Sequence, residues 1–281
     1  MLSYRHAFHA GNHADVLKHL VYAEVLAHMV QKEKSFWIID THAGAGLYSL
    51  TQGFATKNIE FSTGIERLLK AKHLPQTLAH FVAIIRQFNP QNSLDFYPGS
   101  PKIAANFLRE QDKMHLFELH PNDHTLLTEN FAHQNKLVKI DASDGFASLK
   151  RLLPPPSRRA VVLIDPPYEE KHDYQRVISA TKDALARFAT GSYLIWYPLL
   201  QRPEPLEMIA QLKKLDISNW LDISLSVERP SAEGFGMYGS GMFVINPPWK
   251  LAETLEQCMP TLLALLKQDE SASFNLTVQS H

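Results

Sequence analysis

An aspartate, two prolines and a tyrosine follow an apolar run in the stretch AVVLIDPPYEE, residues 160–170. Proline has no amide hydrogen, and it holds the residue before it in an extended conformation. Asp165 and Pro166 both precede a proline. The Asp165 carboxylate and the Pro166 carbonyl are therefore predicted to act as two acceptors aimed at one point, with Tyr168 beside them.

Two converging acceptors suit the exocyclic amine of a nucleobase. Such an amine is a poor nucleophile because its lone pair is delocalised into the ring. Holding both hydrogens on acceptors frees that lone pair for attack on an electrophilic methyl group, a reaction that needs positioning more than a strong base. The base must leave its stack, at a cost on the order of a few kcal/mol. Tyr168 offers a stacking face, a contact worth about 1–3 kcal/mol.

A second motif of the same kind, NPPW, occupies residues 246–249. It follows the last apolar run, which we expect to lie in an antiparallel hairpin at one edge of the sheet. The Asn246 side chain should then open away from the ligand crevice, so we assign the catalytic turn to Asp165. Either motif alone is equally compatible with an ordinary proline turn at a strand end.

Seven short apolar runs are predicted to be strands, and helical patterns at 14–33 (with Asn12 as a cap), 100–111 and 173–189 alternate with them. Near-continuous hydrophobicity is typical of strands that are covered on both faces. The alternation predicts an α/β fold with a mostly parallel sheet. The expected strands are FWIIDTH (36–42), MHLFELH (114–120), LVKIDAS (137–143), AVVLIDPP (160–167), SYLIWYP (192–198), LDISLSVE (221–228) and GMFVINPP (241–248).

Residues 47–97 interrupt this alternation. They contain helical patterns, IERLLKAKHL and TLAHFVAIIRQF, but no convincing strand. We expect an inserted helical subdomain at 47–97, and a main domain made of 1–46 and 98–281.

Three of the predicted strands end in residues suited to binding a ligand at the crevice of an open α/β sheet. Gly44 and Gly46 form a tight turn after the first strand, Glu118 ends the second, and Asp144 with Gly145 follows the third. Glu118 suits a pair of ribose hydroxyls, and the third position suits the amine of an adenine. A glycine pair alone is weak evidence, and the missing third glycine of the dinucleotide fingerprint makes a nicotinamide dehydrogenase a poorer fit.

Composition points to an ordinary globular protein. The chain has 281 residues, a formal net charge of −1, 45% hydrophobic and 20% charged residues, and one cysteine, Cys258. A single cysteine excludes an internal disulfide. No run resembles a signal peptide or a membrane span. We expect a cytoplasmic monomer.

Fourteen histidines raise the possibility of a metal site. His9 and His13 have the i, i+4 spacing of a helical zinc pair, but no third ligand is evident. We therefore predict no metal, and interpret the histidines as polar contacts to phosphate, base or cofactor, or as members of a surface cluster.

A set of motifs extends over nearly the whole chain: LSYRHAFHAGNHADVLKH, DTHAGAG, YPGSP, FELHP, ASDGF, LIDPPY, LIWYP and GMFVINPPWKL. Together they resemble the J-type 23S ribosomal RNA adenine-N6-methyltransferases. The resemblance implies a Rossmann-like class I methyltransferase domain that uses S-adenosylmethionine, with a helical insertion after the first strand. It also implies methylation of an adenine N6 in protein-free 23S rRNA. We further expect no obligate protein partner and no membrane association.

The resemblance also implies roles for individual residues. Asp165 would be the catalytic acceptor. Tyr4, with His6 and Lys18 behind it, would contact the RNA or close over the target base. The cofactor would lie among His19, His42, Ser100, Glu118, Asp144, Gly145 and Asp165. From the turn after the first strand, we expect Gly44 and Gly46 to contact it as well.

Two other classes of function stay open. The methyl acceptor could be a DNA adenine, another rRNA base such as a guanine, or a protein glutamine, because all of these are modified at similar proline turns. Aspartate followed by tyrosine favours adenine. A non-catalytic nucleic-acid-binding module is the remaining alternative, although the intact DPPY motif argues against it.

Overall fold

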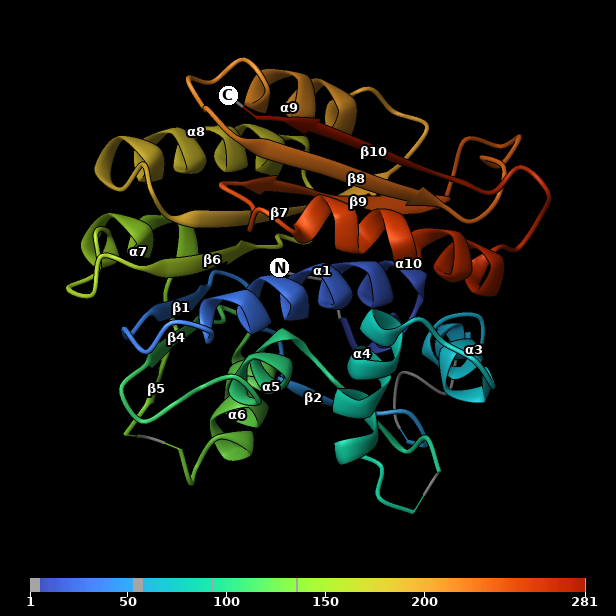
Figure 1. Cartoon of the computed structure of the whole chain (residues 1–281), viewed down its shortest axis with the longest axis horizontal. Coiled ribbons are helices and arrows are strands. Elements are labelled where there is room, and N and C mark those ends of the chain that lie inside the picture. The colour runs from blue at the N-terminus through green and yellow to red at the C-terminus, as the bar shows by residue number, and fades with distance from the viewer. Residues whose placement is uncertain (1–5, 53–57, 92, 135, 281) are drawn as a thin grey trace.

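An eight-stranded sheet lies at the centre of the molecule (Figure 1). The computed structural model describes residues 6–52, 58–91, 93–134 and 136–280. The strand order is β10-β8-β9-β7-β6-β1-β4-β5. The bounds are β1 (Trp37–Asp40), β4 (Lys113–Phe117), β5 (Val138–Asp141), β6 (Ala160–Ile164), β7 (Ser192–Leu199), β8 (Trp220–Ser226), β9 (Gly239–Ile245) and β10 (Ser273–Gln279).

The sheet is parallel over β5, β4, β1, β6 and β7 and antiparallel over β7, β9, β8 and β10. The predicted α/β class with a mostly parallel sheet and an antiparallel hairpin is confirmed. The hairpin of β8 and β9 is not at the edge, however. β9 lies beside β7, and the edge is β10, whose sequence SFNLTVQ alternates polar and apolar residues and therefore lacks the continuous apolar run by which the other strands were identified.

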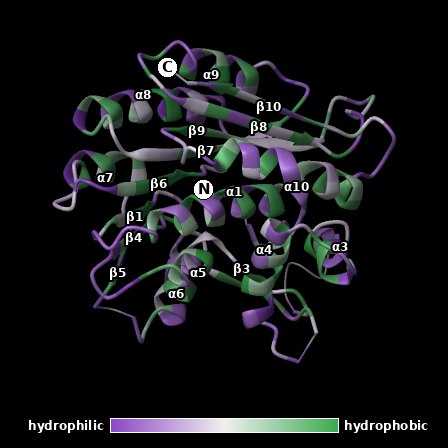
Figure 2. Ribbon diagram, in the orientation of Figure 1, coloured by the Kyte–Doolittle hydropathy of each residue, from purple (hydrophilic) through white to green (hydrophobic). Residues whose placement is uncertain are grey.

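Helices cover both faces of the sheet. The apolar side chains of α1 (His13–Met29), α4 (Gln76–Gln87), α5 (Ser100–Ala105) and α10 (Leu251–Leu266) belong to one hydrophobic cluster. Those of α7 (Gly145–Leu152), α8 (Lys171–Arg187) and α9 (Glu204–Leu212) belong to a second cluster on the opposite face. Most of these helices carry both hydrophobic and hydrophilic segments, as expected when one side is buried (Figure 2).

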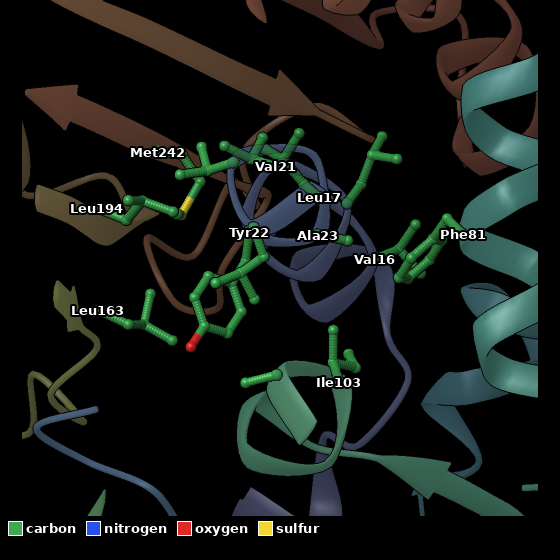
Figure 3. Packing of buried hydrophobic residues seen from close by; sticks show 14 of the residues in the cluster. Val16, Leu17, Val21, Tyr22, Ala23, Phe81, Ile103, Leu163, Leu194 and Met242 are labelled. Atoms are coloured by element: carbon green, nitrogen blue, oxygen red, sulfur yellow. The ribbon is translucent and has the colours of Figure 1, made fainter. Parts of the chain in front are cut away.

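Helix α1 is the exception, because it is buried on nearly all sides. Its N-cap is Asn12, as predicted, whose side-chain oxygen accepts from the amides of Ala14 and Asp15 at 2.9 and 3.0 Å. Figure 3 shows its apolar side chains directed toward α4, α5 and three strands of the sheet. The labelled neighbours are Phe81, Ile103, Leu163, Leu194 and Met242.

The range 47–97 contains α3 (Ile65–Lys70), α4 and the short 3-10 helix η2 (Glu60–Ser62). The expectation of no strand there was wrong. β2 (Leu47–Ser49) and β3 (Phe96–Pro98) pair antiparallel where the segment leaves and rejoins the main sheet. They are only three residues long, and their pairing joins residues about fifty positions apart, which a local pattern does not reveal. The division into a main domain and an inserted subdomain stays a prediction.

The remaining elements complete the frame of the site. They are η1 (His6–Phe8) and α6 (Pro121–Asn130). Helix α5 begins at Ser100, with Gly99 at the N-cap position, and it ends at Ala105 rather than near residue 111. Among the residues described, no helix is long and apolar enough to cross a membrane.

Candidate active site

A cavity of about 460 Å³ opens at the carboxyl ends of the parallel strands, where ligands bind in open α/β sheets. Its volume falls within the range of roughly 300–1,000 Å³ that is typical of small-molecule sites. The turns after β1, β4, β6 and β7 form one side of it. Residues 6–19, from η1 into α1, form another.

Asp165 lies in this cavity directly after β6, and it is paired with Lys18 of α1. The Lys18 ammonium lies 2.6 Å from Asp165 Oδ2 and 2.9 Å from Asp15 Oδ1. Lys18 and Asp15 are only 4% and 1% exposed. Burial alone would lower the pKa of Lys18, but the two carboxylates raise it above its ordinary value, so Lys18 is a buried cation held between two anions.

Asp15 was not predicted as a site residue. Its Oδ2 accepts from the amide of Gly11 and interacts with His6 Nε2, both at 2.9 Å. Burial alone would raise the pKa of this carboxyl, but the charges of His6 and Lys18 hold it well below its ordinary value. The available signal was an Asp–Lys pair at i, i+3 within a helix rich in apolar residues.

The three residues expected to contact RNA differ in their placement. His6 lines the cavity, and its ring centroid lies 5.1 Å from that of Tyr48. Lys18 also lines the cavity, but it is committed to the two carboxylates rather than presented at the surface. Tyr4 lies outside the residues that the structure describes. Contact of these residues with RNA therefore stays a prediction.

The backbone of the turn after β1 is hydrogen-bonded to Glu118, which directly follows β4. Gly44 has φ +60°, a conformation that favours glycine, and its amide donates to Glu118 Oε2 at 2.8 Å. The amide of His120 donates to Oε1 at 2.7 Å. Burial raises the pKa of the Glu118 carboxyl, although these two amides oppose the shift. Glu118 thus presents a carboxylate of fixed orientation to the cavity.

Gly46 and Asp144 do not line the cavity, unlike Gly145. A Cβ on Gly46 would lie 2.9 Å from Leu127 Cδ1, so this glycine serves packing against α6. Asp144 is the N-cap of α7, and its second oxygen binds Arg176 Nη2 at 2.5 Å. The sequence analysis interpreted Asp144 as a ligand contact, whereas the structure gives its side chain two structural partners.

His19 and His42 both line the cavity as neutral imidazoles. Burial holds the pKa of His19 well below its ordinary value and lowers that of His42 to about 4. His19 Nδ1 lies 2.8 Å from the Tyr97 hydroxyl, whereas its buried Nε2 has no hydrogen-bond partner in the described chain. A buried polar atom without a partner next to a cavity is a position for a ligand hydrogen bond.

Ser100 also lines the cavity, but its hydroxyl donates to Asp40 Oδ2 at 2.6 Å. Asp40 ends β1, is fully buried, and accepts the His42 amide at 3.2 Å. Burial raises its pKa to about 6, against the opposing effect of the Ser100 hydrogen bond. Ser100 and Asp40 therefore hold the β1 turn in place.

Tyr168 lines the cavity together with Pro166, but the tyrosine is only 3% exposed. Its hydroxyl donates to the Trp196 carbonyl at 2.6 Å, and its ring centroid lies 4.6 Å from that of Tyr174. Stacking of a base on Tyr168 stays a prediction. The base would have to contact the side of the ring that faces the cavity.

The NPPW turn lies at the opposite end of the sheet. Ile245, the last residue of β9, pairs with Tyr193 near the start of β7, whereas Asp165 follows the end of β6. The side-chain amide of Asn246 donates through Nδ2 to the carbonyls of Ala189 and Gly191 at 2.8 and 2.7 Å. Asn246 does not line the cavity, and its side chain anchors a loop.

The two histidines considered as a zinc pair are not on one helix. α1 begins at His13, whereas His9 precedes it and binds Glu60 of η2 at 3.0 Å. Within the described ranges, no group of three or more histidine, cysteine, aspartate or glutamate residues is arranged to hold a metal ion.

Comparison with known proteins identifies relatives over nearly the whole length. The family described as Ribosomal RNA large subunit methyltransferase D, RlmJ, matches residues 33–277. Ribosomal RNA large subunit methyltransferase J of Escherichia coli (strain K12) is 46% identical over 262 residues, covering 93% of each chain. The protein of the same name from Haemophilus influenzae is 44% identical over 277 residues, covering 98% of each.

A solved structure shares the fold. The crystal structure of protein LPL1258 from Legionella pneumophila has a TM-score of 0.89 and 33% identity, covering 97% of this chain and 99% of that one. Together with the family match over residues 33–277, these similarities show that the chain belongs to the ribosomal RNA large subunit methyltransferase J family.

Proposed function

We propose that this protein transfers a methyl group from S-adenosylmethionine to the exocyclic N6 of an adenine in 23S rRNA. The observation that carries the proposal is the position of Asp165. It follows β6 at the carboxyl edge of the parallel sheet, in the same cavity as Gly44 and Glu118. The two relatives named as ribosomal RNA large subunit methyltransferases support the choice of RNA as the substrate.

The residues of the β6 turn hold the target amine. Lys18 occupies Asp165 Oδ2, so the other carboxylate oxygen, Oδ1, accepts one hydrogen of the amine. The Pro166 carbonyl accepts the second hydrogen, since no amide of the Pro166–Pro167 pair competes for it. The nitrogen lone pair is then directed into the cavity. The extruded adenine lies against Tyr168, in a site that positions the reacting atoms.

The cavity has the features that the cofactor requires. S-adenosylmethionine, when bound, supplies an electrophilic methyl group on a sulfonium. Glu118 provides a carboxylate for the ribose hydroxyls. His19 Nε2, which has no hydrogen-bond partner among the described residues, provides a polar contact for the amino-acid end. Gly145 lines the cavity, and a Cβ there would clash with the Thr41 backbone, so this glycine lets the start of α7 approach the β1 turn. These groups belong to the chain itself, so cofactor binding is expected without a metal.

Replacing Glu118 with alanine is expected to weaken binding of the cofactor product S-adenosylhomocysteine by about 1.5–3 kcal/mol, the value of a hydrogen bond to a charged group. The substitution also releases the Gly44 and His120 amides that Glu118 now holds. Isothermal titration calorimetry measures the change directly.

Glu129→Ala is the matched control, because Glu129 is an exposed acid on the neighbouring helix α6 and should bind the product like the wild type. Wild-type affinity in Glu118→Ala would remove Glu118 from the cofactor site.

The function itself is tested by offering several acceptors to the purified protein with methyl-labelled S-adenosylmethionine. We expect label in naked 23S rRNA and little in assembled large subunits, duplex DNA or protein extract. Base extrusion needs free access to the nucleotide. The formal net charge of −1 also argues against a broad electrostatic footprint on nucleic acid.

Nuclease digestion and mass spectrometry then identify the product as N6-methyladenosine. Label in DNA or protein instead of RNA would refute the substrate. Faster methylation of mature subunits than of naked RNA would refute the protein-free state. No incorporation into any acceptor would favour a non-catalytic binding module. We place this activity in the cytoplasm, in a monomer without an obligate protein partner.

A further inference from the structure

The loop between β8 and β9, residues 227–238, emerges at the same end of the sheet as the cavity. Gly239, which begins β9, pairs with Leu199 at the end of β7 and with Ser226 at the end of β8. β8 therefore runs parallel to β7, and the loop lies at their carboxyl ends (Figure 1). Met237 of this loop lines the cavity that contains Asp165.

Phe235 is the outermost aromatic side chain of this loop, with 81% of its surface exposed. Gly234 and Gly236 flank it with φ +79° and +93°. A Cβ placed on Gly236 would find no atom within 4 Å, and one on Gly234 would meet only Gln201 Oε1, at 3.4 Å. The loop tip thus stands away from the protein body, and Phe235 has no packing role that explains a phenylalanine there.

The tip nevertheless has a defined turn. The Gly234 amide donates to the Ser231 carbonyl at 3.0 Å, and the Glu233 amide donates to Ser231 Oγ at 3.2 Å. Two residues after Phe235, Met237 reaches the cavity wall. Two extended residues span roughly 7 Å, so the ring lies within the reach of a nucleotide next to one bound in the cavity.

We propose that Phe235 stacks on an unpaired base adjacent to the target adenine, and so helps to hold the RNA open around the extruded nucleotide. This inference rests on the proposed function. Extruding a base leaves its neighbours without a stacking partner. An exposed aromatic ring offers a replacement that accepts any base. The ring and the cavity would then bind consecutive nucleotides.

Other features of the loop agree with RNA as the occupant. The loop carries Arg229 but also Glu228 and Glu233, so it offers RNA the stacking face of Phe235 and no excess of positive charge. A stable protein interface would need about 1,000 Å² or more of buried surface. The loop offers one projecting ring instead of such a patch. Among the described residues, Trp249 is the other aromatic of comparable exposure, at 78%, and it lies at the opposite end of the sheet.

The test uses the full-length protein and a 23S rRNA transcript made without ribosomal proteins. Phe235→Ala is expected to weaken RNA binding by about 5- to 150-fold, the range that corresponds to loss of one base–aromatic stack. Phe235→Leu should lose as much, and Phe235→Trp should retain binding. Affinity for S-adenosylhomocysteine should be unchanged in all three variants. Trp249→Ala is the matched control and should bind RNA like the wild type.

An abasic nucleotide locates the contact. Transcripts are made with the base removed on the 5′ or the 3′ side of the mapped methylation site. The wild-type protein should bind one of these transcripts as weakly as Phe235→Ala binds the unmodified RNA. Combining the abasic nucleotide with Phe235→Ala should then cause no further loss of affinity.

Wild-type RNA affinity in Phe235→Ala, full retention by Phe235→Leu, or additive losses in the combined experiment would each overturn the inference. If the wild type neither binds nor methylates RNA, the proposed function fails as well. If the wild type methylates RNA and only the Phe235 effects are missing, the failure is confined to this inference.

Discussion

Asp165→Ala is expected to reduce the rate of methyl transfer by at least about 100-fold, comparable to the loss of a positioned catalytic group in other enzymes. The side chain supplies one of the two acceptors for the amine in the proposed site. The protein should remain folded, although with reduced stability, because Lys18 loses one carboxylate but keeps its second partner, Asp15, at 2.9 Å. Single-turnover rates at saturating cofactor separate chemistry from binding.

The matched change is Asn246→Ala in the second proline turn. It should leave the single-turnover rate close to that of the wild type, because Asn246 lies at the other end of the sheet. It should lower the free energy of unfolding by about 1–3 kcal/mol, since two carbonyls lose their donor and alanine must adopt the positive φ of this position. An active Asp165→Ala beside an inactive, folded Asn246→Ala would reverse the assignment of the catalytic turn.

Asp15→Ala is expected to lower the free energy of unfolding by about 3–5 kcal/mol, the typical cost of removing one partner from a buried ion pair. Asp15 is 1% exposed and is the partner of Lys18, His6 and the Gly11 amide. Without it, Lys18 is a buried cation with a single carboxylate, Asp165. Urea unfolding followed by circular dichroism measures the change.

The exposed pair of Glu66 and Lys70 on α3 is the control. Lys70 Nζ lies 2.8 Å from Glu66 Oε2, but 71% of the lysine side chain is exposed. Glu66→Ala should therefore lower the free energy of unfolding by no more than about 1 kcal/mol. Asp15→Asn combined with Lys18→Met removes one charge of each sign and should cost less than the sum of the single changes. Equal, small effects of Asp15→Ala and Glu66→Ala would show that the buried pair is unimportant for stability.

Most of the sheet could be predicted from the sequence because parallel strands buried on both faces are continuous apolar runs. β10 lacks this signal: it pairs only with β8, and its burial pattern alternates between exposed and intermediate.

The end of α5 depends on tertiary contacts. Arg109, inside the predicted helix, donates to the carbonyls of Val30 and Lys32 and binds Asp112, so the chain there leaves the helical path.

The part of the candidate site that could be predicted from the sequence is the set of residues that directly follow the parallel strands. Glu118 and Asp165 were predicted to lie together because the carboxyl ends of parallel strands converge on one crevice, and both line the cavity. Asp144 has a structural role as an N-cap, a signal already present in an aspartate just before a helix. Asp15 could not be identified in this way. Its importance follows from Lys18, whose partner Asp165 is 147 residues further along the chain.

The burial of α1 has a consequence for folding kinetics. This helix packs against β6, β7 and β9, strands that come more than a hundred residues later in the chain. It also carries Asp15 and Lys18, while Asp165 directly follows β6. Contacts of such large sequence separation form slowly. Secondary structure can therefore return before the site exists, and the recovery of turnover after dilution from denaturant reports the final docking of α1 onto the sheet.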